Sequence, residues 1–290
     1  MTTERSAPQA QALSLCDRLS GRPLRVLITR PADSAHETAE LVHSAGGEAL
    51  VCPCLFPTPP ADEGALAAAL FSQPRPNVVA FTSRYAVRAV ADSLARRQPS
   101  LSLSQGLADC WVAAVGPRTA EALADEGRPA DLISQSDGPD APSSSAAGLA
   151  QQLVARFAAA DSAQGPVQVL FPRAAEARPT LPAALRQAGL QVIEVEAYRM
   201  RAATPTELAP LRQALQAGEV DLAPFGSPRS VAIALSVLPA DAAALFAAVR
   251  VGAIGETTAA ALREAGLRVD VVSHSARFDE LLSGLAALPR

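Results

Sequence analysis

The stretch VLITR at residues 26–30 decides the fold, because the chain repeats it as VLFPR at residues 169–173. Each stretch is a short apolar run ending in arginine, and a glycine follows each arginine after sixteen residues, at Gly46 and Gly189. A run of this length that precedes a segment with helical spacing predicts a buried strand leading into a helix. Both halves of the chain therefore contain the same strand–helix unit.

Two further pairs of segments repeat in the same order. FTSR at residues 81–84 corresponds to FGSPR at residues 225–229, and GPRTAEAL at residues 116–123 corresponds to GETTAAAL at residues 255–262. The members of each pair lie about 140 residues apart. Three matched segments in one order predict two similar α/β units in one chain. Each segment stands where a strand gives way to a helix, a junction at which α/β proteins bind ligands.

Strands and helices alternate almost throughout the sequence, which favours parallel sheets covered by helices on both faces. Residues 47–60 and 190–205 occupy equivalent places in the repeat, and both stretches are extended and end in proline. We expect them to run side by side as a two-stranded antiparallel linker. The predicted architecture is thus two similar parallel-sheet α/β domains with a cleft between them.

Composition excludes several classes of function. The chain has 290 residues, 49% hydrophobic and 19% charged, which suffices for two cores, and its net charge of −4 gives no field that attracts nucleic acid. All 25 basic residues are arginine, so a P-loop lysine and a Schiff-base lysine are both missing. The four cysteines lack CxxC spacing and the three histidines are scattered, so no metal site is expected. No apolar run reaches the length of a membrane span, and a cytoplasmic protein is expected.

Gly116 and Gly255 each precede a helix and are followed by threonines, Thr119 in the first half and Thr257 and Thr258 in the second. One interpretation is simple N-capping of the helix by threonine. The other is an anion site, formed by free N–H groups and the positive end of the helix dipole. The sequence leaves both open, although the recurrence favours a ligand more than one copy would.

Ser83 and Ser227 start the helices of the other repeated pair, with Thr82 before Ser83 and Pro228 at the expected first position of its helix. Serine can cap the helix, or hydroxyl and N–H groups can bind a carboxylate. Two arginines stand at matched strand ends, where a surface ion pair and a ligand contact are both possible. They are Arg30 and Arg173.

Tyr198 lies on the extended stretch predicted to join the domains. A phenol is protonated at neutral pH, so it can donate a proton but is a poor base. A half-buried strand tyrosine with no catalytic role is the competing interpretation. Only the surroundings of this hydroxyl can separate the two.

Taken together, these segments resemble the uroporphyrinogen-III synthase family over residues 25–285. Their order and spacing carry the resemblance, since none is specific alone. One departure is Gly226, which stands where that family often has a hydroxyl residue. The segments are LITRP at residues 27–31, FTS at 81–83, VG at 115–116, EAY at 196–198, FGSP at 225–228 and IG at 254–255.

The resemblance implies that the first strand and helix pack with the C-terminal part of the chain. The implied domains are residues 24–50 with 198–290, a discontinuous α/β domain, and residues 56–190, a second α/β domain. Residues 1–23 are polar and are expected to be a disordered lead-in.

The resemblance also implies a hydro-lyase that closes hydroxymethylbilane into uroporphyrinogen III, with loss of water and inversion of the D ring, and uses no metal or organic cofactor. Tyr198 matches the family's tyrosine and is the expected proton donor. Arg30 and Arg173 join the expected substrate-binding residues on the strength of the repeat alone. The substrate-contact residues implied by the family motifs are Ser83, Gly116, Thr119, Ser227, Pro228 and Thr258. Thr82 and Thr257, which stand next to Ser83 and Thr258, are also expected to bind substrate.

A non-enzymatic two-domain protein that binds a small ligand is the alternative, because such proteins also have two α/β lobes. A monomer is expected, since nothing in the sequence marks a large apolar interface. No nucleic acid and no membrane is expected as a partner. A transient contact with the preceding enzyme of the pathway stays open.

Overall fold

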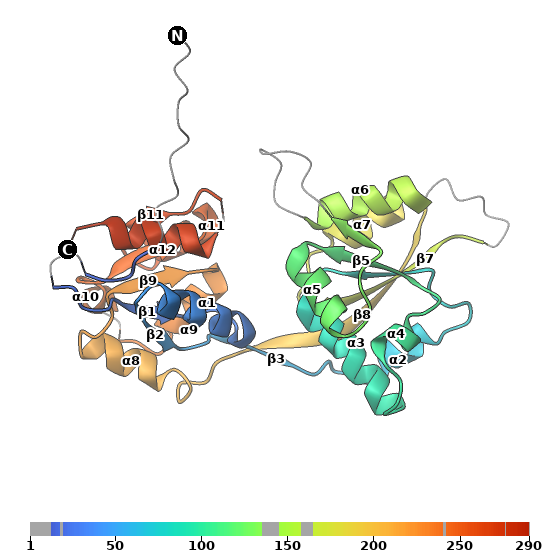
Figure 1. Ribbon diagram of the computed structural model, residues 1–290, viewed down its shortest axis with the longest axis horizontal. Coiled ribbons are helices and arrows are strands. Elements are labelled where there is room, and N and C mark those ends of the chain that lie inside the picture. Colours follow the sequence, from blue (N-terminus) through green and yellow to red (C-terminus); the bar gives the residue numbers. More distant parts are fainter. Residues whose placement is uncertain are drawn as a thin grey trace, which may run out of the picture. The chain divides into compact units, whose positions relative to one another are not determined.

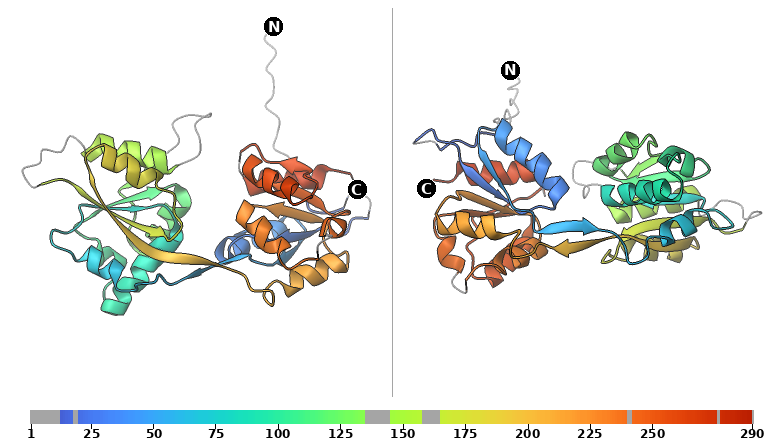
Figure 2. Two further views of the ribbon diagram at one scale, coloured as in Figure 1. Left: turned by 180° about the vertical axis from the view of Figure 1, so that it is seen from behind. Right: turned by 90° about the horizontal axis from the view of Figure 1, so that it is seen from below.

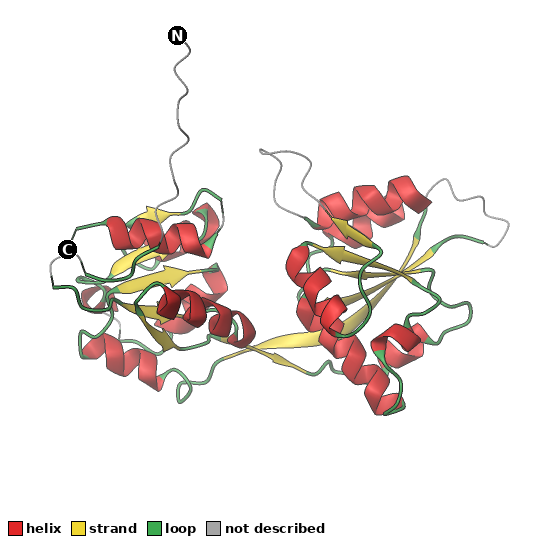
Figure 3. Cartoon of the chain, viewed as in Figure 1, coloured by secondary structure: helices red, strands yellow, loops and turns green. Residues whose placement is uncertain are grey.

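The computed structural model describes residues 13–17, 20–134, 145–157, 165–239, 242–275 and 277–289, in which helices and strands alternate (Figure 3). The chain divides into two compact units. Unit 1 comprises Met1–Phe56 and Arg201–Arg290, and unit 2 comprises Pro57–Met200. Each unit has its own sheet and its own core.

Unit 1 contains a five-stranded sheet in the order β11-β10-β9-β1-β2, and its neighbouring strands are parallel. Leu211, Val231 and Leu262 pack from α8, α9 and α11 on one face, while α1 and α12 cover the other (Figure 1). The strands are β1 (Arg25–Ile28), β2 (Glu48–Val51), β9 (Leu222–Phe225), β10 (Arg250–Ala253) and β11 (Val271–Val272). The helices are α1 (Ala32–Ser44), α8 (Ala209–Gln216), α9 (Pro228–Leu235), α10 (Ala242–Leu245), α11 (Glu256–Glu264) and α12 (Phe278–Ala287).

Unit 2 contains a six-stranded sheet in the order β3-β8-β7-β4-β5-β6, parallel from β8 to β6. Leu66, Val90 and Leu123 pack from α2, α3 and α5 on one face, and α6 and α7 cover the other (Figure 2). The strands are β3 (Leu55–Thr58), β4 (Val78–Phe81), β5 (Trp111–Val115), β6 (Leu132–Ser134), β7 (Gln168–Ala174) and β8 (Gln191–Ala202). The helices are α2 (Ala65–Leu70), α3 (Arg84–Arg97), α4 (Leu103–Gly106), α5 (Pro117–Asp125), α6 (Ala146–Phe157) and α7 (Thr180–Gln187).

The two sheets repeat one hydrogen-bond pattern at their amino ends. In unit 1 the Asp221 N–H donates to the Arg25 carbonyl (2.9 Å), and the Arg25 N–H donates to Asp221 Oδ2 (2.9 Å). In unit 2 the Asn77 N–H donates to the Gln168 carbonyl (3.0 Å), and the Gln168 N–H donates to Asn77 Oδ1 (2.8 Å). Asp221 precedes β9 as Asn77 precedes β4. The prediction of two similar parallel-sheet α/β units is confirmed.

The chain passes from one unit to the other within β3 and within β8, which are neighbouring strands. The antiparallel linker stays a prediction. The observed division differs from the expected boundaries at two places. Phe56 belongs to unit 1 instead of the second domain, and residues 198–200 belong to unit 2 instead of the discontinuous domain. Tyr198 is therefore part of unit 2.

Part of the expected lead-in is folded. Leu15 is fully buried in the core of unit 1, where its N–H donates to the Ala45 carbonyl (2.8 Å) and its carbonyl accepts from Leu24 N–H (2.8 Å). Cys16 forms a β-bridge with Pro23. The prediction of a disordered segment over residues 1–23 is thus wrong for residues 13–17 and 20–23, while residues 1–12 and 18–19 lie outside the described residues. Leu13 and Leu15 both pack on this core, but two leucines among polar residues form too short a pattern to predict a buried segment.

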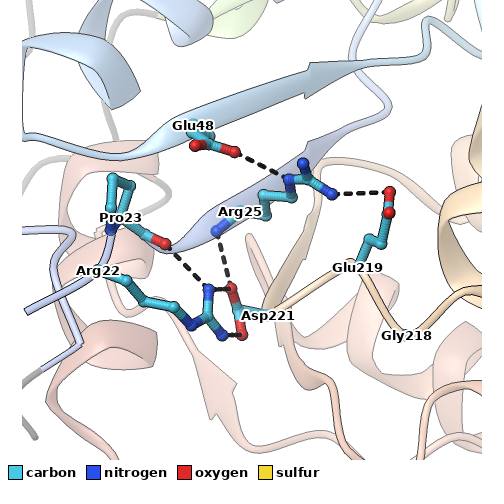
Figure 4. Close-up of a pocket in the computed structure, with 7 residues that line it drawn as sticks. All are labelled: Arg22, Pro23, Arg25, Glu48, Gly218, Glu219 and Asp221. Carbon is cyan, nitrogen blue, oxygen red and sulfur yellow. Dashed lines mark hydrogen bonds and ion pairs between the residues drawn. The ribbon is translucent and has the colours of Figure 1, made fainter. Parts of the chain in front are cut away.

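Ion pairs hold the chain just before β1 against the amino ends of the strands. The Arg22 guanidinium donates to both oxygens of Asp221 (2.6 and 2.8 Å), and Arg25 bridges Glu48 and Glu219 (2.8 and 2.7 Å; Figure 4). These charged residues line a surface pocket. Arg25 and Glu48 are the first residues of β1 and β2, so the pocket lies at the edge of the sheet opposite the strand ends that carry the repeated serine and threonine turns. Within the described ranges, every helix is too short or too polar to cross a membrane.

Candidate active site

The direction of strand succession reverses once in each sheet. In unit 1 the chain runs from β1 outward to β2, and from β9 outward through β10 to β11. In unit 2 it runs from β4 outward through β5 to β6, and from β7 outward to β8. Open α/β sheets bind ligands outside the carboxyl ends of the strands at such reversals. The two positions are between β1 and β9 and between β4 and β7.

A proline lies in a strand at each reversal. Pro224 is in β9 and Pro172 in β7, and proline has no N–H to give to a ladder. The recorded pairing of β9 with β1 is Val26↔Leu222, and that of β7 with β4 runs over Val169 and Leu170, both before the proline. Pro224 can stand in a central strand because it borders this short ladder at the reversal.

Ser83 and Tyr198 meet at the reversal of unit 2. Ser83 follows β4 and caps α3, with its Oγ accepting the Ala86 N–H (3.2 Å). The same Oγ lies 3.0 Å from the Tyr198 hydroxyl oxygen. The Tyr198 ring packs against Tyr85, with centroids 5.3 Å apart and planes tilted by 40°. The structure therefore brings together two of the predicted site residues and adds Tyr85, which the sequence analysis missed.

A bulge in the β7–β8 ladder sets the direction of Tyr198. Arg173 pairs with Glu196, but Ala174 pairs with Tyr198 instead of Ala197, so the register shifts by one residue. Successive strand residues normally point to opposite faces. Here Ala197 and Tyr198 both pack on the core that α3 covers, and the bulge accounts for this.

The two carboxylates of β8 near Tyr198 are already engaged. Glu194 forms ion pairs with Arg173 and Arg186, each at 2.8 Å. Glu196 accepts from Arg199 Nε (2.5 Å) and from the Ala61 N–H (2.9 Å). The Arg199 hydrogen bond, followed by that from Ala61, lowers the pKa of Glu196. A carboxylate that is ionised at neutral pH cannot donate a proton, so Glu196 is not a candidate proton donor.

The Arg173 guanidinium is held by hydrogen bonds and an ion pair within unit 2. Besides the ion pair with Glu194, its Nη1 donates to the carbonyls of Ala174 and Ala175, both at 2.9 Å. These contacts hold the strand end next to the bulge. The predicted contact of Arg173 with substrate stays a prediction.

Gly116 and Gly255, and not the threonines, are the N-caps of α5 and α11. Gly116 has φ 74°, a left-handed conformation that favours glycine. Thr119 and Thr258 lie in the first turns with only 4% and 3% of their surfaces exposed, so the capping interpretation of the threonines is wrong. Thr257 is exposed. Among the described residues no side chain caps α5 or α11, which keeps the anion interpretation of their first N–H groups open.

Ser227 caps α9 as Ser83 caps α3, so the capping interpretation of both serines is confirmed. Its Oγ accepts the Ser230 N–H (3.1 Å), and its hydroxyl donates to Ser230 Oγ (3.0 Å). Pro228 is the first residue of the helix and is exposed. The two repeats therefore differ in the second hydrogen-bond partner of the serine hydroxyl, which is Tyr198 in unit 2 and Ser230 in unit 1. Thr82 is half-buried after β4.

Phe278 occupies the space that Gly226 leaves open. A Cβ atom at position 226 would lie 3.3 Å from the Phe278 ring. The Arg30 guanidinium lies 4.2 Å above the same ring, and its Nη1 donates to Thr38 Oγ1 (2.9 Å). Where the family often has a hydroxyl residue, this chain therefore has a glycine whose open space is filled by the Phe278 ring, and that ring positions Arg30 at the reversal of unit 1.

The part of the chain that the structure describes contains no group of three histidine, cysteine or acidic side chains arranged to hold a metal ion.

Fold and site together define an α/β protein of two parallel-sheet units with hydroxyl-bearing turns at both chain reversals. A family model for uroporphyrinogen-III synthase HemD matches residues 36–283. A uroporphyrinogen-III synthase from Synechococcus elongatus is 30% identical over 270 residues, which cover 89% of this chain and 92% of that relative. The chain belongs to the uroporphyrinogen-III synthase family, whose members are lyases of haem biosynthesis.

Solved structures agree on the fold. A uroporphyrinogen-III synthetase from Helicobacter pylori superimposes with a TM-score of 0.54 at 16% identity, over 90% of this chain and 96% of that chain. A mutant uroporphyrinogen III synthase from Thermus thermophilus gives a TM-score of 0.51 at 23% identity, over 90% and 96% of the two chains. Family membership supports the lyase over the alternative of a non-enzymatic binding protein.

Proposed function

We propose that this chain is a uroporphyrinogen-III synthase, which cyclises hydroxymethylbilane to uroporphyrinogen III with loss of water and inversion of the D ring. The observation that carries the proposal is the Tyr198 hydroxyl at the reversal of unit 2, 3.0 Å from Ser83 Oγ, in a chain of this family. A phenol and a hydroxyl suit a reaction whose leaving group is water.

Tyr198 acts as the proton donor. The phenolic proton moves to the hydroxyl of the substrate's hydroxymethyl group while the carbon–oxygen bond breaks, and the bonding electrons leave with the oxygen as water. The nitrogen of the electron-rich pyrrole supplies electron density to the carbon left behind. Inversion requires that the substituted α carbon of ring D, which already bears the bridge to ring C, attacks it first. The bond from that carbon to the ring C bridge then breaks, and the bridge re-forms at the free α carbon of ring D, which loses the proton that restores the proton balance. None of these steps requires a metal or an organic cofactor.

The remaining residues serve to orient a flexible polyanion, so the catalysis is largely positioning. Arg30, held by Phe278 and Thr38, offers a guanidinium for a carboxylate. Gly116 and Gly255 open helices whose first N–H groups suit anions. Thr119 and Thr258 are buried, so their contribution is through the backbone. The other proposed contacts are Thr82, Ser83, Ser227, Pro228 and Thr257.

The test is the isomer of the product. Purified protein is supplied with hydroxymethylbilane, the products are oxidised, and the isomers are separated. We expect isomer III, with heat-inactivated protein giving isomer I, the product of the uncatalysed reaction. Isomer I alone from native protein, together with tight binding of a small ligand, would instead favour the binding-protein alternative.

The proposal includes a monomeric protein in the cytoplasm. The family model and the described helices are compatible with this location. Sedimentation velocity of the full chain is expected to give a single species of the monomer mass, 29.9 kDa.

A further inference from the structure

We propose that Ser83 is a positioning residue, whose hydroxyl donates to the Tyr198 oxygen and thereby turns the phenolic proton outward and stabilises the phenolate left after proton transfer. Tyr85 fixes the plane of the Tyr198 ring. The catalytic consequence rests on the proposed function, whereas the direction of the hydrogen bond does not.

The helix cap favours the Ser83 hydroxyl as the donor, because one lone pair of its oxygen already accepts from the helix. A backbone N–H can only donate, so Ser83 Oγ is the acceptor in its contact with the Ala86 N–H (3.2 Å). Accepting that bond polarises the serine O–H and makes it a better donor. The Tyr198 oxygen lies within reach of its proton, at 3.0 Å from Ser83 Oγ. The phenolic proton is then directed to another acceptor, which is the geometry a proton donor to substrate requires.

The equivalent serine of unit 1 already shows this pattern. Ser227 Oγ accepts the Ser230 N–H (3.1 Å) while its hydroxyl donates to Ser230 Oγ (3.0 Å). The two serines have the same place in the repeat and nearly the same backbone, with φ values of −156° and −163°. A capping serine in this turn thus accepts from the helix and donates onward. At position 83 the onward acceptor is a phenol.

The helix gives the contact its electrostatic sense. Ser83 begins α3, a helix of 14 residues whose amino end carries partial positive charge. The sequence of bonds from Ala86 N–H through the Ser83 hydroxyl to Tyr198 brings this end of the helix within one hydroxyl of the phenol oxygen. A hydrogen bond to the charged form of an acid favours that form. The arrangement therefore eases loss of the phenolic proton.

The ring is held as well as the hydroxyl. Tyr85 packs on Tyr198 with a centroid distance of 5.3 Å, and the bulge between Arg173 and Ala174 turns the Tyr198 side chain towards α3. Ser83 and Tyr85 lie on the same turn, so one helix start supports both parts of the tyrosine.

Spectrophotometric titration tests the direction of the bond, because the chain has only two tyrosines. In Tyr85→Phe, the ultraviolet absorbance of phenolate reports Tyr198 alone, and adding Tyr198→Phe must remove the signal. In that background we expect Ser83→Ala to raise the midpoint of the titration by about one pH unit or more, since the charged form loses a hydrogen bond. An unchanged or lower midpoint would overturn the proposal.

Ser227→Ala is the matched control, because it removes the equivalent cap but touches no tyrosine. Its midpoint is expected to equal that of the parent, and a shift as large as that of Ser83→Ala would also overturn the proposal. Ser83→Thr keeps the hydroxyl and should keep the midpoint. If Ser83→Ala does not fold, Ser83→Cys should raise the midpoint of the titration by a smaller amount, since a thiol is a weak donor. An unchanged midpoint in Ser83→Cys would then overturn the proposal. All titrations are made without substrate, so failure to form isomer III leaves their outcome intact.

Discussion

Tyr198 lies on a strand whose neighbouring carboxylates are engaged by arginines, and this makes its hydroxyl the residue to test first. Tyr198→Phe keeps the ring and its packing but has no proton to give. We expect kcat to fall at least severalfold and by up to about 100-fold, with KM little changed, because a general acid acts in the transition state. Steady-state kinetics with hydroxymethylbilane measure both constants. His36→Gln, an exposed change, is the control, and an unchanged kcat in Tyr198→Phe would dismiss the phenol as the acid.

Gly226 and Phe278 give a second residue-scale prediction. Gly226→Ser restores a hydroxyl but puts a Cβ atom 3.3 Å from the Phe278 ring, so the ring and the Arg30 guanidinium above it must shift. We expect KM for the polycarboxylate substrate to rise by about threefold to tenfold with a smaller change in kcat. In an Arg30→Met background, Gly226→Ser should cause no further rise in KM. Independent effects of the two changes on KM would contradict the coupling.

At the scale of the element, Arg250 ties β10 to the end of α12. Its side chain is buried, and Nη1 donates to the carbonyls of Leu285 (3.0 Å) and Leu288 (3.0 Å). Cations at helix carboxyl ends stabilise, and hydrogen bonds from charged groups are strong. Arg250→Leu is expected to lower the free energy of unfolding by about 2 kcal/mol in urea denaturation. Arg263→Leu, on the exposed face of α11, should change it by less than about 0.5 kcal/mol.

Glu207 stabilises the turn before α8 in a pH-dependent way. The Arg201 hydrogen bond, then that of the Thr204 N–H, lowers the pKa of Glu207 from 4.5 to about 2. A carboxyl with a depressed folded pKa contributes stability that is fully present above its unfolded pKa and is lost as the pH falls through the folded pKa. The Tm difference between the parent and Glu207→Gln should therefore shrink between pH 4.5 and about 2. Arg201→Met should show the same window, and a constant difference across it would contradict the assignment.

The order of helices and strands was predictable from the sequence because both halves of the chain contain the same local pattern of apolar runs and helix starts. The runs at residues 26–30 and 169–173 became β1 and β7, and the serine turns became the caps of α3 and α9. The repeat goes further than the sequence analysis found, since Asp131 Oδ2 accepts the Val112 N–H (2.7 Å) as Asp270 Oδ2 accepts the Val251 N–H (2.8 Å). Single aspartates in loops carry no periodic signal.

The parts of the site that escaped prediction depend on contacts between distant segments. The bulge that turns Tyr198 arises from its pairing with Ala174, and the commitment of Arg173 arises from Glu194 across the ladder. Neither follows from local spacing, because register is a property of two strands. Tyr85 had a usable signal, since it is the other of the chain's two tyrosines and stands two residues after Ser83.

For the whole molecule, the division into units predicts which part folds alone. Unit 2 is one continuous stretch with its own six-stranded sheet, whereas unit 1 needs both ends of the chain. A fragment of residues 55–202, which runs from the first residue of β3 to the last of β8, retains both helical layers and their cores. We expect it to unfold cooperatively in urea, and residues 1–54 alone to show no transition.

The fragment also tests where the tyrosine site is built. Ser83, Tyr85 and Tyr198 all lie within it, so with Tyr85→Phe the phenolate titration of Tyr198 should have the same midpoint in the fragment as in the full chain. Equal midpoints follow if the helix start of α3 and the bulge of β8 alone set the environment of the phenol. A fragment that folds cooperatively but titrates at a different pH would mean that residues of unit 1 help to set it. Failure of the fragment to fold would contradict the autonomy of unit 2 and leave the serine–tyrosine contact to be judged in the full chain.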